Sequence, residues 1–208
     1  MKIVVLTLVV FALLATPYNA QGIEIVVKGS HITNLKVINQ LIDESFAQDA
    51  KNGGYSFPGV EVRFRDPDTK GLLITTGWWQ TRQTADKKIT YNFPEDLGIP
   101  SLTDIHTQQV KINNFTLGLS QYLFGYKRYR ARMGFSTGFG LYAYDEEYVL
   151  ALPDNLGEEN LRTRRTGILP AINLTFDQEL RFSRYFILAE AGFKNGAAFS
   201  LGFGIRLP

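Results

Sequence analysis

The chain has 208 residues, of which 13% are aromatic and 19 are glycine, and it contains no cysteine. The lack of cysteine excludes disulfides, thiol catalysis and thiolate metal sites. Lysine and arginine (22) nearly balance aspartate and glutamate (20), and no basic run is present, so we expect no nucleic acid partner.

The N-terminal segment has the features of a secretory signal peptide. Lys2 supplies a positive start, residues 3–15 are apolar apart from Thr7, and Ala20 is a small residue suited to cleavage. The apolar stretch is shorter than the ~20 residues of a transmembrane helix, which disfavours the alternative of an uncleaved anchor. We expect residues 1–20 to direct export and residues 21–208 to form a single domain.

Residues 22–28 predict the first strand, because Ile23, Ile25 and Val27 alternate with Glu24, Val26 and Lys28. A long loop over residues 30–52 should follow, with a short helix whose apolar residues recur at helical spacing. These are Leu35, Ile38, Leu41, Ile42 and Phe46, and Thr33 or Asn34 could cap the helix. The helix is expected to pack on the barrel rim; alternatively it lies at the lipid interface or closes the barrel mouth.

Seven further strands are predicted at residues 59–64, 71–83, 110–124, 129–144, 167–182, 185–193 and 197–207. Asn195-Gly196 is the strongest hairpin signal in the chain. Residues 84–108 and 145–165 are predicted to be long polar loops. Short and long connections therefore alternate, as in outer-membrane barrels, and counting residues 22–28 gives an even number of strands.

The strands have one bulky apolar face and one face that is small or charged. In residues 129–144, Phe135 and Phe139 lie on the first face, and Gly134 and Gly138 lie on the second. A soluble lipocalin-like barrel would place the apolar face inside. Glycine suits a crowded interior better than a solvated surface, however, and the aromatic volume is too large for a narrow lumen. We therefore expect the apolar face to point outward into lipid.

The inward face then carries charged residues. They are Glu61, Arg63, Arg130, Arg132, Asp177, Glu179, Arg181, Glu190 and Arg206, joined by Lys194. Unpaired buried charges are very unfavourable, so these groups must pair. We interpret them as a salt-bridge network that fills the lumen in place of a hydrophobic core. The alternatives are a catalytic or proton-conducting cluster, or a path for a small solute. Aromatic girdles are expected from residues such as Trp78, Tyr122, Tyr144 and Tyr148, with Trp79 pointing inward.

The closing segment, residues 200–207, resembles the C-terminal assembly signal of the small eight-stranded outer-membrane barrels of Gram-negative bacteria, the porin-like outer membrane protein beta-barrel group. The signal has a polar residue, a glycine two positions later and then alternating hydrophobic residues. Leu207 and Pro208 depart from it, since the family prefers a terminal aromatic residue. The resemblance implies residence in the cell outer membrane, assembly by the barrel-assembly machinery, and contact with outer-membrane lipid and lipopolysaccharide.

Members of that family include anchors, adhesins, resistance factors and lipid A-modifying enzymes, so the family does not fix the function. Barrel-type lipid A deacylases use a His and a Ser two positions apart. His31 and His106, both expected in external loops, have Thr33 and Gln108 at that spacing and do not match. With Asp104 the two histidines would form only an incomplete metal site.

The sequence thus predicts an all-β protein, a single closed antiparallel transmembrane β-barrel of about eight strands with a short helix in the first long loop. We expect a structural or surface-interaction role, without catalysis or a cofactor. The three long loops are candidates to bind an extracellular ligand. The alternatives are a barrel enzyme that modifies lipid A and a soluble exported ligand-binding barrel.

Overall fold

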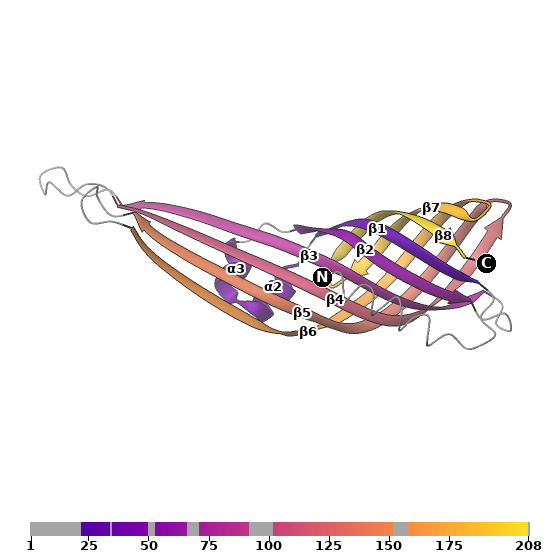
Figure 1. Cartoon of the computed structure of the whole chain (residues 1–208), viewed down its shortest axis with the longest axis horizontal. Coiled ribbons are helices and arrows are strands. Elements are labelled where there is room, and N and C mark those ends of the chain that lie inside the picture. Colours follow the sequence, from indigo (N-terminus) through magenta and orange to yellow (C-terminus); the bar gives the residue numbers. More distant parts are fainter. Residues whose placement is uncertain are drawn as a thin grey trace, which may run out of the picture.

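The computed structural model describes residues 22–33, 35–49, 53–65, 71–91, 102–151 and 158–207. Eight antiparallel strands form a closed barrel, each paired with the next in sequence and β8 paired with β1 (Figure 1). The strands are β1 (Ile23–Thr33), β2 (Gly53–Arg65), β3 (Leu72–Tyr91), β4 (Leu102–Tyr126), β5 (Tyr129–Ala151), β6 (Glu158–Phe182), β7 (Tyr185–Lys194) and β8 (Ala197–Arg206). The predicted fold class is confirmed. The predicted signal peptide lies outside the described residues.

The first strand closes the barrel. β1 pairs with β2 on one side and with β8 on the other, where Glu24 lies opposite Arg206. The amide of Leu207 donates a hydrogen bond to the carbonyl of Ile23 at 2.8 Å, so the start of β1 lies beside the end of β8. The strand predicted over residues 22–28 is therefore confirmed. The hairpin at Asn195-Gly196 is also confirmed, with Asn195 in the left-handed region at φ 55°.

The apolar face points outward, as the alternation predicted. Large hydrophobic side chains are exposed on the barrel surface, and we call this set the apolar belt: Ile74, Leu117, Leu119, Met133, Phe135, Phe139, Leu141, Ile172, Leu174, Phe176, Leu180, Ile187, Phe193, Phe199, Leu201 and Phe203. Inside, glycine makes room for larger neighbours. A side chain on Gly204 would collide with the ring of Phe186 on the adjacent strand. An inward apolar face, which a lipocalin-like barrel requires, is contradicted.

Four strands continue far beyond the barrel. β3 to β6 contain 20 to 25 residues each, whereas β7 and β8 contain 10. We call the protruding four-stranded sheet the extension; it comprises residues 83–91, 102–110, 144–151 and 158–165, joined in continuous register (Figure 1). Its nine residues from Gln83 to Tyr91 span roughly 30 Å at ~3.3 Å per residue. Residues 84–91, 102–108, 145–151 and 158–165 were predicted as loops, and that prediction was wrong.

Two short helices, not one, follow β1: α2 (Lys36–Ile42) and α3 (Glu44–Asp49). Ile38, Ile42 and Phe46 pack in one cluster with extension residues that include Val110 and Tyr144. Leu35 packs with Trp79, Ala171 and Ala198 at the mouth of the barrel. Among the alternatives, closure of the mouth agrees with these contacts, and Figure 1 shows both helices beside the part of the molecule where β3 to β6 extend beyond the barrel.

The helix ends differ from the prediction. The N-cap of α2 is Leu35 without a side-chain cap, because Thr33 remains in β1. At α3, the Asp43 side chain accepts a hydrogen bond from the Phe46 amide at 3.2 Å. No helix among the described residues is long and apolar enough to cross a membrane.

Candidate functional site

Charged side chains fill the middle of the barrel. We call the following ten residues the lumen network: Glu24, Lys28, Glu61, Arg63, Arg132, Asp177, Glu179, Arg181, Glu190 and Lys194. They comprise five cations and five carboxylates, so their formal charges cancel. They come from strands β1, β2, β5, β6 and β7, and only closure of the barrel brings them together.

Arg63 lies at the centre of the lumen network, with no exposed surface. Its Nε donates to Glu61 Oε1 at 2.5 Å, one terminal nitrogen contacts Glu179, and the other lies 3.3 Å from Asp177. Arg132 shares Asp177 and Glu61 with it. Glu61 and Asp177 thus each pair with both guanidinium groups, so the buried charges have partners of opposite sign. Asp177 Oδ1 and Arg132 Nε make no hydrogen bond with a described residue.

A second group of ion pairs extends towards the barrel mouth. Lys28 Nζ lies 2.6 Å from Glu61 and 2.5 Å from Glu190, so it links the two groups. Lys194 Nζ lies 2.5 Å from Glu190, and the hydroxyl of Ser200 donates to the same carboxylate at 2.9 Å. The barrel interior is therefore cross-linked by polar bonds between strands that are far apart in the sequence.

Seven of the nine predicted lumen residues belong to this network; they are Glu61, Arg63, Arg132, Asp177, Glu179, Arg181 and Glu190. Arg130 and Arg206 instead lie exposed near strand ends and form no ion pair with any described residue. Sequence reasoning missed Glu24 and Lys28, although both alternate with the apolar residues of the predicted first strand. Tyr122, expected in an aromatic girdle, accepts a hydrogen bond from Arg181 at 2.5 Å in the lumen.

Beside the lumen network lies a cavity of about 40 Å³, lined by residues that include Lys28, Glu61, Arg132, Asn173 and Lys194. A polar cavity of this size holds a few water molecules. It is far too small to pass a nutrient-sized solute.

The inner face of the extension carries a second polar cluster. His106 Nε2 lies 2.8 Å from Glu146 Oε1, and the imidazole stacks on Tyr148 with ring centroids 3.9 Å apart. Gln108 donates to the hydroxyl of Tyr144 at 2.9 Å. Burial raises the pKa of Tyr144 above its ordinary value, and the nearby carboxylates of Glu146 and Asp43 raise it further. The Tyr144 hydroxyl therefore stays protonated.

The histidines lie on strands, so their predicted loop placement was wrong. His106 belongs to β4 and faces inward, whereas His31 belongs to β1 and is exposed. Tyr144 and Tyr148, expected in a girdle, belong to the inner cluster instead. Among the described residues, no group of three side chains could hold a metal ion.

The outer surface changes character along β3 and β4. Ile74 and Leu119 are paired within the apolar belt, and Phe115 lies further along, tilted against Phe139 with ring centroids 5.5 Å apart. Trp78, expected in an aromatic girdle, is instead buried and lines the cavity beside the lumen network. Gln80 then donates to Asn113 at 2.8 Å, and Arg82 and Lys111 follow as the next outward pair. The transition from apolar through aromatic to polar and charged residues marks one boundary of the apolar belt.

No family model and no curated protein matches the sequence. Among solved structures, the chain is similar to Ail, the attachment invasion locus protein of Yersinia pestis, in complex with sucrose octasulfate, at 10% identity over 90% of this chain and 99% of that one (TM-score 0.46). It is also similar to Neisserial surface protein A, at 11% identity over 90% and 98% (TM-score 0.41). A third is the N-terminal β-barrel domain of Pseudomonas aeruginosa OprF, at 13% identity over 90% and 98% (TM-score 0.37).

The fold itself follows from the strand pairing of this chain. A closed ring of eight antiparallel strands with an apolar exterior and a charged interior is the architecture of small outer-membrane barrels. The fold that the closing segment implied is therefore confirmed.

Proposed function

We propose that this chain is an integral outer-membrane barrel that displays a rigid sheet at the cell surface and acts in surface interactions, without catalysis. The observation that carries the proposal is the continuation of β3 to β6 beyond the barrel as one sheet in unbroken register. Loops on a rigid scaffold commonly carry binding functions, and here the scaffold itself extends outward.

The dimensions of the barrel support insertion in a membrane. β1, β7 and β8 contain 11, 10 and 10 residues, and a transmembrane β-strand needs about 9–11. The apolar belt would face lipid, and the lumen network would fill the interior in place of a hydrophobic core. The N-terminal segment supports export, and the closing segment supports folding by the barrel-assembly machinery. Lipopolysaccharide would then surround the outer end of the barrel.

The orientation follows from the lengths of the connections. Outer-membrane barrels have short periplasmic turns and long external loops. One end of the barrel contains the two-residue turns that follow Tyr126 and Phe182. The start of β1 near Ile23 and the end of β8 near Arg206 lie at the same end, which we assign to the periplasm. The extension and the two helices then lie outside the cell.

The extension has two sheet edges that can bind an extracellular ligand. The pairing of β3 with β2 stops at Arg82, and that of β6 with β7 stops at Asn173. Beyond these points neither strand has a second neighbouring strand among the described residues. Unpaired edges accept an extended segment of another chain. Arg162, Arg164 and Arg165 are exposed along β6, so an extended acidic segment fits this edge best.

A variant with shortened hairpins tests this function. Short turns would replace residues 34–52, 84–109 and 144–165, since Thr33 pairs with Gly53, Gln83 with Val110 and Ala143 with Thr166. We expect the shortened barrel to reach the outer membrane but to lose binding of a fluorescent alternating Val-Glu peptide to intact cells. The full chain should bind this peptide better than an alternating Val-Lys peptide. Equal peptide binding by the shortened and full chains would contradict the proposal.

A further inference from the structure

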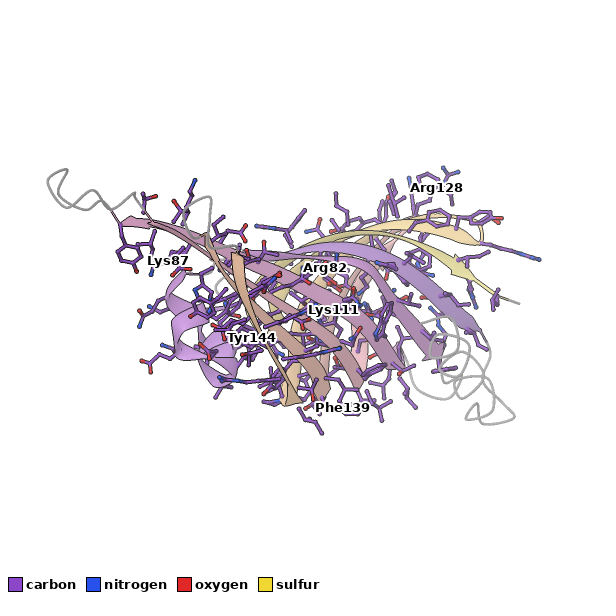
Figure 2. The ribbon with its side chains drawn as sticks, turned by 60° about the vertical axis from the view of Figure 1, so that its left-hand side comes forward. Arg82, Lys87, Lys111, Arg128, Phe139 and Tyr144 are labelled. Atoms are coloured by element: carbon purple, nitrogen blue, oxygen red, sulfur yellow. The ribbon has the colours of Figure 1, made fainter. Side chains whose placement is uncertain are left out.

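Two cations lie side by side on the outer surface where the extension leaves the barrel. Arg82 of β3 and Lys111 of β4 are direct cross-strand partners. Both face outward, because their neighbours Gln83 and Ile112 are buried on the inner face. Figure 2 shows the two residues together at mid-length of the molecule, well away from Lys87 towards the far end of the extension.

The layers beneath this pair place it at the level of lipid headgroups. On the same face, Phe115 of β4 and Phe139 of β5 form an aromatic pair at the edge of the apolar belt, with ring centroids 5.5 Å apart, and the hydrogen-bonded pair of Gln80 and Asn113 follows. Aromatic side chains are enriched where acyl chains meet headgroups. Arg82 and Lys111 lie one pair further out, which is where the phosphates of an outer-leaflet lipid would be.

The charge of this pair is not compensated by any residue that the structure describes. Like charges directly opposite each other on a sheet are destabilising. Neither cation forms an ion pair with a carboxylate in the part of the chain that the structure describes. The outward carboxylate of Asp145 lies on β5, the strand next to that of Lys111, and it is shared by Arg162 and Arg164 at 3.7 and 3.8 Å. An external anion would remove the repulsion between Arg82 and Lys111.

We propose that Arg82 and Lys111 form a binding site for a phosphate group of an outer-leaflet lipid. The guanidinium fork of Arg82 can donate two hydrogen bonds to one phosphate, and Lys111 adds a mobile point charge. Gln80 and Asn113 provide polar contacts on the lipid side of that phosphate, and the acyl chains would lie along Phe115 and Phe139. This inference rests on the membrane placement in the proposed function, and it assigns the contact with lipopolysaccharide to named residues.

Native mass spectrometry of the folded full chain in dodecyl maltoside micelles tests the site. The probe is lipid A carrying both phosphates, titrated against the wild type and the double variant Arg82→Gln/Lys111→Gln. We expect the double variant to bind lipid A at least tenfold more weakly. Dephosphorylated lipid A should bind the wild type as weakly as phosphorylated lipid A binds the double variant.

A matched control removes two charges at the other end of the barrel. Lys127→Gln/Arg128→Gln alters the exposed turn between β4 and β5, and Figure 2 places Arg128 far from Arg82. This control should bind lipid A like the wild type, and an unchanged gel-mobility shift on heating would show that both variants fold. Equal lipid A binding by the wild type and the Arg82/Lys111 variant would overturn the site. Full displacement of lipid A by equimolar inorganic phosphate would overturn its assignment to a lipid.

The two experiments are independent. Lipid A binding is measured on the full chain in micelles, and peptide binding compares full and shortened chains on cells. Failure of the lipid A experiment would leave the display function intact, and failure of the peptide experiment would leave the lipid site intact.

Discussion

At the scale of single residues, Arg63 explains how the barrel tolerates a charged interior. A guanidinium group without water contact is strongly unfavourable unless anions surround it. Four carboxylates lie within salt-bridge distance of Arg63, and those of Glu24, Glu61 and Asp177 are 3.6, 2.5 and 3.3 Å away. Its planar group also lies over the Phe186 ring, with Cζ 5.6 Å from the centroid.

Replacing Arg63 by methionine should destabilise the barrel more than replacing other arginines. Arg63→Met keeps most of the volume of the side chain but removes one cationic partner from each of four buried carboxylates, so the lumen network is left with one excess negative charge. Breaking a buried ion pair in this way costs about 3–5 kcal/mol. The measurement is urea unfolding of the folded protein in micelles, followed by gel mobility without boiling.

Arg130→Met is the matched control for that experiment. Arg130 is exposed and has no ion pair with a described residue, so its loss should change the unfolding free energy by at most about 0.5 kcal/mol. Equal unfolding midpoints for the two variants would show that the lumen network does not stabilise the barrel.

At the scale of elements, α2 and α3 join the barrel to its extension. Neither helix is long enough to be stable alone, so their structure depends on packing. Phe46 is fully buried and meets Tyr144 edge to face, with ring centroids 6.0 Å apart. Arg165 reinforces the contact from β6, pairing with Asp43 at 3.3 Å.

Phe46→Ala should release the two helices without unfolding the barrel. Loss of a buried aromatic ring costs about 3–5 kcal/mol. Here it should weaken the packing of the two helices on the extension rather than the stability of the barrel. We expect trypsin to cleave after Lys36 at least tenfold faster than in the wild type, while the gel-mobility shift on heating persists. Leu41→Ala serves as the control, since Leu41 lies on α2 but is 59% exposed. Equal cleavage rates for the two variants would mean that the helices are not held by this cluster.

At the scale of the whole molecule, the sequence predicted the barrel well and the extension poorly. Alternation is informative where one face meets lipid and the other meets charge, as at Phe135 and Arg132. In the extension both faces are largely polar, so Gln108 and Gln109 look alike although one is buried and the other is partly exposed. A long polar segment without a clear difference between its two faces is then predicted to be a loop.

Most members of the lumen network could be predicted, but their pairing could not. Alternation assigns Arg63 and Asp177 to the inner face, but they are separated by 114 residues in the sequence. Their contact depends on barrel closure and register, which no local pattern contains. Arg130 and Arg206 follow the same alternation but lie near strand ends, where a long side chain reaches solvent.

We expect the apolar belt to face lipid in an outer membrane. The most direct test is to fractionate Gram-negative cells expressing the full chain and to compare gel mobility of the mature protein with and without boiling. We predict recovery in the outer-membrane fraction, with a compact unboiled band that shifts on heating. Recovery as a soluble periplasmic or secreted protein would show that the apolar belt does not face lipid.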